Sequence, residues 1–148
     1  MSTTVPFETT LRVRDTCLCL HAQRAARTLA RRFDDALGTV GLTNQQFSLL
    51  LALNRPEPPP MGPVARLLAM DRTTLTAALK PLERRGLVRI EPSRSDRRTR
   101  LIVLTRAGAE TLAAAVPIWE GLHEEFERRL DDPPADAVRA ALVRLGDH

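Results

Sequence analysis

Four arginines and one aspartate stand close together in the stretch PSRSDRRTR, residues 92–100. A guanidinium group is permanently charged and planar, so it can pair with phosphate oxygens or enter a narrow minor groove of DNA. The same composition also fits a disordered basic tract or an ordinary solvated turn. The sequence on either side decides between these readings.

The positive charge of the chain is concentrated around this stretch. Residues 71–100 contain nine basic and four acidic side chains, a net charge of +5, whereas the whole chain carries +4. A field localised in this way attracts polyanions and makes their binding sensitive to salt. Charge alone leaves a merely solvated basic face as the alternative.

A helix with two different faces is predicted just before the basic stretch, over residues 71–85. Asp71 is a suitable N-cap, because its carboxylate can accept hydrogen bonds from the first turn. Leu75, Leu79 and Leu82 share one side and predict the packing face. The remaining surface offers groups that can pair with guanine, contact thymine methyl groups or bind phosphates, namely Arg72, Thr73, Thr74, Thr76 and Lys80.

The segments that flank the basic stretch predict a β-hairpin. LVRIE and TRLIVLT are short, rich in branched side chains and partly alternating, as strands are. Ser93, Ser95 and Asp96 between them favour a turn. We therefore expect a hairpin over residues 88–104 rather than a disordered tract, because the apolar side chains of both flanking segments favour a fixed position in the fold.

The rest of the chain predicts helices. An apolar stripe at helical spacing indicates one long helix from Leu11 to about Val40, with the positions Leu18, Ala22, Ala25, Leu29, Phe33 and Leu37. Thr43 and Gln46 form a capping box before a helix over residues 44–54, and residues 61–70 predict a short helix. Thr105 caps a second long helix that reaches about Leu130, and residues 136–145 predict a terminal one.

Residues 42–108 resemble the MarR family of bacterial winged helix-turn-helix regulators. The matching segments are LTNQQFSLL, VARLLAMDRTTLTAALKPLERRGLV and SDRRTRLIVLTRAG, of which the last is the most specific. The long first helix and the helix around Trp119 also match in length and position. The resemblance implies a mainly α fold with a small β-hairpin wing. Residues 41–105 would form the winged DNA-binding region, and residues 1–40 and 106–148 would form a helical dimerisation region.

The function implied by this resemblance is sequence-specific transcriptional regulation, in most members repression. A homodimer would bind a pseudo-palindromic operator in double-stranded DNA, with the 71–85 helix in the major groove and the hairpin in the minor groove. In the family's Asp-x-Arg motif the arginine enters the minor groove and the aspartate holds it, which assigns these roles to Arg98 and Asp96. Arg94, Arg97 and Arg100 would then contact phosphates or remain solvated.

The family also implies two ways of sensing a signal. One is a small aromatic or phenolic acid bound between the dimer helices and the winged region, and nothing in the sequence identifies such a ligand. The other is peroxide sensing by one cysteine in the first helix, and Cys19 stands at about that place. The peroxide-sensing members use tyrosines to activate this cysteine, and the chain has no tyrosine. A buried structural cysteine is therefore the favoured interpretation.

Cys17, Cys19 and His21 also raise the question of a metal site. On a continuous helix, residues two apart point in opposite directions, so Cys17 and Cys19 would neither share a metal nor form a disulfide. Cys17 and His21 supply only two of the four ligands of a zinc site. We expect no metal and no cofactor.

Other classes of protein are less well supported. A winged-helix module that binds only proteins is disfavoured by the +5 window. The sequence offers no Ser/His/Asp set and no glycine-rich phosphate loop, so we expect neither catalytic residues nor an enzyme. No apolar run is long enough for a membrane span and no signal peptide is visible, so a cytoplasmic protein is expected.

Overall fold

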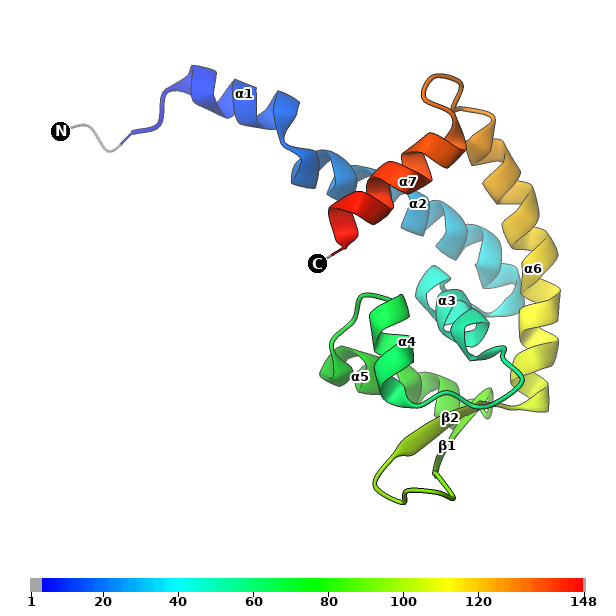
Figure 1. The fold of residues 1–148 in the computed structure, drawn as a ribbon. Coiled ribbons are helices and arrows are strands. Elements are labelled where there is room, and N and C mark those ends of the chain that lie inside the picture. Colours follow the sequence, from blue (N-terminus) through cyan, green and yellow to red (C-terminus); the bar gives the residue numbers. More distant parts are fainter. Residues whose placement is uncertain (1–3, 148) are drawn as a thin grey trace.

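The computed structural model describes residues 4–147 and divides into a helical framework and a smaller unit that carries a β-hairpin (Figure 1). The framework consists of α1 (Phe7–Thr16), α2 (Leu18–Leu37), α6 (Arg106–Glu127) and α7 (Ala135–Gly146). The smaller unit consists of α3 (Asn44–Leu53), α4 (Met61–Leu67), α5 (Arg72–Arg84), β1 (Val88–Pro92) and β2 (Arg100–Leu104). A short 3₁₀ turn, η1 (Gly38–Val40), joins the two parts. The expected fold, mainly α with a hairpin wing, is confirmed.

The core of the smaller unit lies beneath α5. The predicted packing face is correct, because Leu75, Leu79 and Leu82 are fully buried. They belong to one apolar cluster with residues of α3, α4 and β2, including Leu49, Leu50, Val64 and Ile102. Fully burying a leucine contributes about 1.5–3 kcal/mol. This cluster therefore fixes which side of α5 faces the core and which side faces solvent.

The hairpin is joined to the rest of the molecule along strand β2 and at its base. Its strands are antiparallel, with Ile90 opposite Ile102, and the N–H of Ile102 donates to the carbonyl of Pro59 at 2.9 Å. At the base, Gly108 of α6 packs so closely that an added Cβ would lie 2.1 Å from the carbonyl oxygen of Leu87. The wing is thus in direct contact with the start of α6.

The caps expected from the sequence are present. Thr43 and Gln46 form the predicted capping box at the start of α3. Asp71 caps α5 through the N–H of Thr74, and Thr105 caps α6 through the N–H of Gly108. These three side chains define where the helices of the smaller unit and α6 begin.

The prediction of one long helix from Leu11 to Val40 is wrong, because the chain leaves the helical conformation at Cys17. This residue has φ −69° and ψ 112° and separates α1 from α2. Two side chains satisfy backbone groups at the break: the hydroxyl of Thr16 donates to the carbonyl of Arg12 at 2.6 Å, and the Cys17 sulfur accepts from the N–H of Leu20 at 3.4 Å. Such local bonds can interrupt a helix even where no proline or glycine is present.

The second long helix is shorter than expected, because α6 ends at Glu127 rather than near Leu130.

α2 and α6 form the body of the framework. Phe33 of α2 packs against Phe126 of α6 with ring centroids 5.6 Å apart. Arg32 lies over the same ring of Phe126 and forms an ion pair with Glu125 at 3.0 Å, which lowers the pKa of that carboxyl. The contact between the two helices is therefore both aromatic and ionic.

α1 and α7 leave apolar side chains without cover. Neither helix contains a buried residue, and α1 projects away from the body in Figure 1. Phe7 is 70% exposed and Val13 is 50% exposed on α1, and Leu142 is 54% exposed on α7. Among the described helices, none has the length and apolar character that crossing a membrane requires.

Candidate DNA-binding surface

The solvent-facing side of α5 carries all five of the side chains singled out in its sequence. Arg72, Thr73, Thr74, Thr76 and Lys80 are all exposed. Asp71 lies at the start of the helix, where the N–H of Thr74 donates to its carboxylate at 2.7 Å and lowers the pKa of that carboxyl. The hydroxyl of Thr76 donates to the carbonyl of Arg72 at 2.8 Å. Its methyl group and an oxygen lone pair therefore remain available for a ligand.

The loop of the hairpin is held by its own side chains. Asp96 accepts hydrogen bonds from the backbone N–H of Arg98 at 3.0 Å and from the hydroxyl of Thr99 at 3.3 Å. Ser93 and Ser95 are joined through their hydroxyl oxygens at 3.0 Å. Asp96 thus binds the backbone N–H of Arg98. The family motif led us to expect that Asp96 would hold the arginine side chain.

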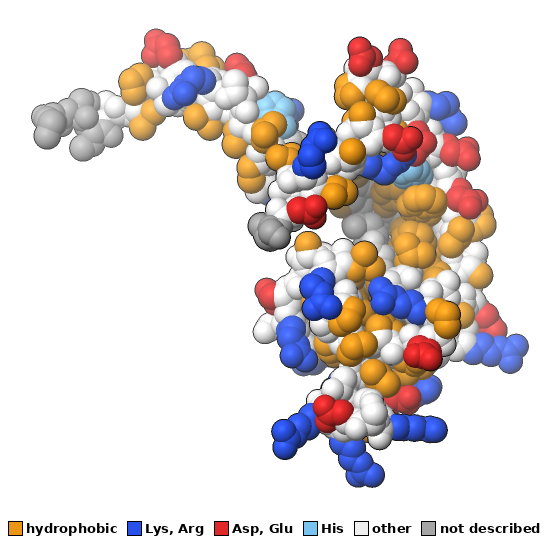
Figure 2. Space-filling model, in the orientation of Figure 1, with side chains coloured by type: hydrophobic (Ala, Val, Ile, Leu, Met, Phe, Trp, Pro, Cys, Tyr) orange, Lys and Arg blue, Asp and Glu red, His pale blue; other side chains and the backbone are white. Residues whose placement is uncertain are grey.

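Apart from Arg89, which pairs with Glu91 at 3.1 Å, the basic side chains of α5 and the hairpin are exposed and form no ion pair within residues 4–147. Arg94, Arg97, Arg98 and Arg100 are exposed. No ion pair formed within residues 4–147 involves any of these arginines, Arg72 or Lys80. Figure 2 shows basic side chains radiating from the hairpin end of the molecule, the end where Figure 1 also places α5. Their charge is not neutralised by the protein and can act on an anionic partner.

A contact that the sequence did not suggest ties the framework to the winged unit. Asp34 of α2 accepts two hydrogen bonds from Asn44, one from its backbone N–H at 2.7 Å and one from its amide nitrogen at 2.8 Å. These bonds hold the pKa of the Asp34 carboxyl below its usual range. The partners stand ten positions apart across the η1 turn. The only signal in the sequence is an acid ten positions upstream of a helix N-terminus, which is too common to be specific.

A cleft of about 440 Å³ opens beside this contact, between α2, α3 and α6. Its walls are mainly apolar, and Phe47 and Trp119 face each other across near-parallel rings with centroids 6.4 Å apart. The lining residues are Phe33, Leu37, Asn44, Phe47, Ser48, Leu51, Val116 and Trp119. We call this space the aromatic cleft. It could not be found from the sequence, because its walls come from three separate helices.

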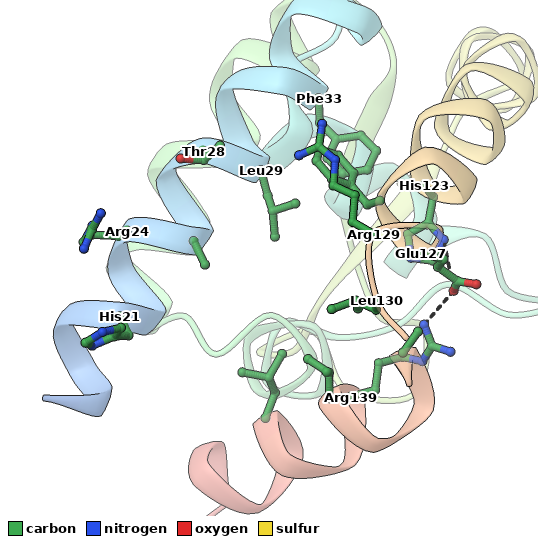
Figure 3. A pocket seen from close by; sticks show the side chains of 15 residues that line it. His21, Arg24, Thr28, Leu29, Phe33, His123, Glu127, Arg129, Leu130 and Arg139 are labelled. Atoms are coloured by element: carbon green, nitrogen blue, oxygen red, sulfur yellow. Dashed lines mark hydrogen bonds and ion pairs between the residues drawn. The ribbon is translucent and has the colours of Figure 1, made fainter. Parts of the chain in front are cut away.

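A larger cleft of about 710 Å³ lies between α2, α6 and α7 (Figure 3). Leu29 of α2 and Leu130 point into it, and a polar cluster stands at one side. In that cluster Glu127 accepts from Arg139 at 2.8 Å and lies 3.4 Å from His123. This open apolar space adjoins the uncovered side chains of α7. We call it the framework cleft.

The two cysteines are free, with Cys17 half-buried and Cys19 exposed. The expectation of a buried structural cysteine is thus wrong for Cys19, whose sulfur lies 3.5 Å from the amide nitrogen of Gln23. The break at Cys17 also removes the premise that both cysteines stand on one continuous helix. Within residues 4–147, no group of three or more His, Cys, Asp or Glu side chains is placed to hold a metal ion.

Comparisons with known proteins agree with this geometry. Residues 40–99 match the sequence model of the MarR family. The transcriptional regulator HosA of Escherichia coli O127:H6 is 40% identical over 91 residues, which cover 60% of this chain and 66% of HosA, just under two thirds of its length. The structure of the Mycobacterium tuberculosis transcriptional regulator MosR in complex with DNA is 37% identical, with a TM-score of 0.81, and the match covers 88% of this chain and 94% of that one. The transcriptional repressor CouR bound to a 23-mer DNA duplex is 30% identical, with a TM-score of 0.81 and coverages of 91% and 96%.

Proposed function

The chain belongs to the MarR family of transcriptional regulators, and we propose that it is a sequence-specific DNA-binding repressor. The observation that carries this proposal is the set of exposed, unpaired cations that α5 and the hairpin present at one end of the molecule. This set includes Arg72, Lys80, Arg94, Arg97, Arg98 and Arg100. The related regulators MosR and CouR are bound to DNA in their structures. A cytoplasmic location forms part of the proposal, since the operator lies on the chromosome.

We assign the two elements to different grooves. α5 enters the major groove, where Arg72, Thr73, Thr74, Thr76 and Lys80 face bases and phosphates. The hairpin lies along the minor groove, where Arg98 enters and Asp96 keeps its backbone in place. The phosphates on either side are contacted by Arg94, Arg97 and Arg100.

The active species in this proposal is a homodimer. Exposed apolar residues on α1, α2 and α7 need a cover that the protomer does not provide, and soluble monomers rarely leave extended apolar patches open. The framework formed by residues 1–40 and 106–148 would pair two copies. Each winged region, residues 41–105, would then read one half of an inverted repeat. Two such regions require half-sites about one helical turn apart, roughly 34–36 Å.

Release from the operator would follow the binding of a small molecule in the aromatic cleft. This cleft lies between the framework and the winged unit and has the size of a small-molecule site. Peroxide sensing by Cys19, or by Cys17 as the second possible redox residue, is not carried further. Within residues 4–147 the side chain that hydrogen-bonds to the Cys19 sulfur is the amide of Gln23, and the sequence contains no tyrosine to activate this cysteine. No catalytic role is proposed for any residue.

The experiment that tests this function is fluorescence anisotropy with DNA from the region that flanks the gene. We expect salt-steep binding to one inverted repeat, and Arg98→Ala and Arg72→Ala should each weaken it by at least about tenfold, since specific arginine contacts contribute about 1–3 kcal/mol. Arg14→Ala removes the same charge from α1 and serves as the control. If both Arg98→Ala and Arg72→Ala leave operator binding unchanged, the assigned surface is wrong.

A further inference from the structure

We propose that the aromatic cleft selects uncharged aromatic molecules that carry a hydrogen-bond donor, and that it rejects aromatic carboxylates. This inference rests on the proposed function, because it names the class of ligand that the regulator would sense. The proposed ligand class differs from the aromatic or phenolic acids that the family resemblance implies. Three observations carry it: the shape of the walls, the polar groups in them, and their charge.

The walls fit a planar ring. Six of the eight lining side chains are apolar, and three of them, Phe33, Phe47 and Trp119, are aromatic. The volume of about 440 Å³ lies in the range of about 300–1,000 Å³ that is usual for small-molecule sites. Leu51 is 51% exposed at the side of the cleft and would be covered by a bound molecule. A flat apolar ligand therefore gains contact area here.

The polar groups in the walls suit a ligand that donates hydrogen bonds. Asn44 donates its amide N–H to Asp34, which leaves its amide oxygen free to accept. The Ser48 hydroxyl forms no hydrogen bond with any side chain or backbone group in the part of the chain that the structure describes. It can accept or donate. An O–H or N–H group on the ligand satisfies the Asn44 oxygen, whereas a carboxylate offers only acceptors.

The charge of the cleft opposes an anion. No lysine, arginine or histidine lines it, while Asp34 stands behind Asn44 with its pKa lowered and is therefore ionised at neutral pH. Moving a carboxylate out of water without a cation partner is costly. The framework cleft makes the contrast plain, because its lining includes Arg24, Arg129 and Arg139. The aromatic cleft therefore differs from the framework cleft in having no cation in its lining.

The test uses two probes of nearly the same shape, 2-naphthamide and 2-naphthoate, titrated at neutral pH. Trp119 is the only tryptophan and lies in the wall of the cleft, so its fluorescence reports occupancy directly. Calorimetry provides a second measurement. We expect 2-naphthamide to bind at least about tenfold more tightly than 2-naphthoate. Equal or tighter binding of the acid, or binding of neither probe, overturns the proposal.

Variants locate the site. Ser48→Leu fills the cleft and should abolish 2-naphthamide binding, whereas Ser95→Leu makes the same change in the hairpin and should leave it intact. Retained binding in Ser48→Leu overturns the proposal, and circular dichroism shows that each variant is folded.

Asp34→Asn removes the charge behind the cleft, so it should reduce the preference for the amide over the acid several-fold. An unchanged preference contradicts the electrostatic part of the argument.

Operator binding, measured on the same samples, separates this proposal from the proposed function. If the protein binds its operator but prefers the acid or ignores both probes, the ligand class is wrong and the repressor function stands. If 2-naphthamide binds through Ser48 while no DNA is bound, the ligand class stands and the repressor function is wrong.

Discussion

At the residue scale, Asp96 orders the loop of the hairpin, and in the proposed function this order would aid DNA binding without a contact between Asp96 and DNA. Both of its oxygens accept hydrogen bonds from the next turn of its own loop, from Arg98 and Thr99. An ordered loop lowers the entropy that Arg98 loses on entering a groove. A negative charge close to DNA has the opposite effect, because it repels the phosphates. The balance between these two effects can be measured.

We predict that Asp96→Ala weakens operator binding by about tenfold, because the loss of loop order outweighs the removal of one repulsive charge. Asp96→Asn keeps one acceptor oxygen and should restore part of the affinity. Anisotropy at several salt concentrations measures both variants. A gain in affinity for Asp96→Ala would mean that electrostatic repulsion dominates and that the loop needs no support.

Asp34 gives a prediction about pH. Its folded pKa lies below the ordinary value of about 3.9. Its contribution to stability is therefore complete above the unfolded pKa and is lost as the pH falls through the folded one. Urea unfolding at fixed protein concentration should show that Asp34→Ala loses less stability than the native chain between pH 5 and pH 2. Parallel curves for the two proteins in this window would contradict the assignment.

At the scale of the elements, the packing of α6 on the hairpin depends on the absence of a side chain at Gly108. We predict that Gly108→Ala lowers the free energy of unfolding by about 1–3 kcal/mol, because its Cβ meets the Leu87 carbonyl and forces the two elements apart. Gly121 lies on the same helix with open space around it. Gly121→Ala should therefore raise stability by up to about 1 kcal/mol. Urea unfolding compares them, and equal effects would contradict the packing argument.

The elements also show what the sequence could and could not predict. The caps at Thr43, Asp71 and Thr105 were predicted correctly, because a cap depends on residues only three positions apart. The break at Cys17 was missed, because no helix-breaking residue marks it and two side chains satisfy the backbone there.

The candidate DNA-binding surface could be predicted from the sequence, whereas the aromatic cleft could not. The exposed faces of α5 and the hairpin follow from local patterns of charge and apolar spacing. The aromatic cleft does not, because Phe33, Phe47 and Trp119 meet only in the folded chain. The hold of Asp34 on Asn44 also depends on the fold, since the η1 turn brings the two residues together.

At the scale of the whole molecule, the positive charge gathered on α5 and the hairpin can be measured through the salt dependence of DNA affinity. Each arginine that neutralises a phosphate contributes about 0.9 to the slope of log affinity against log salt. The combined variant Arg94→Ala, Arg97→Ala and Arg100→Ala should reduce the slope by up to about 5 in a homodimer, with little change in preference between sequences. An unchanged slope would show that these three side chains remain solvated.

The uncovered apolar surface of the framework predicts a homodimer. Leu142 is 54% exposed and lines the framework cleft. Leu142→Glu should shift the protein from dimer to monomer at micromolar concentration, because a charge in an apolar interface is costly. Leu67 on α4 is 61% exposed, and Leu67→Glu should leave the dimer intact. Light scattering after size-exclusion chromatography measures both, and a native chain that is monomeric would contradict the proposal.

The direct contact at Gly108 makes α6 a lever. Its 22 residues span about 33 Å, and with no side chain between Gly108 and the Leu87 carbonyl the hairpin has to follow the helix. Trp119, in the wall of the aromatic cleft, lies eleven residues along the same helix, about 16 Å from Gly108. A tilt of α6 by about 5° about that point would move the Gly108 end by about 1.4 Å, which is less than half of the rise of about 3.4 Å between successive bases of one DNA strand. A ligand that tilted α6 at the cleft would therefore shift the wing by a fraction of a base step.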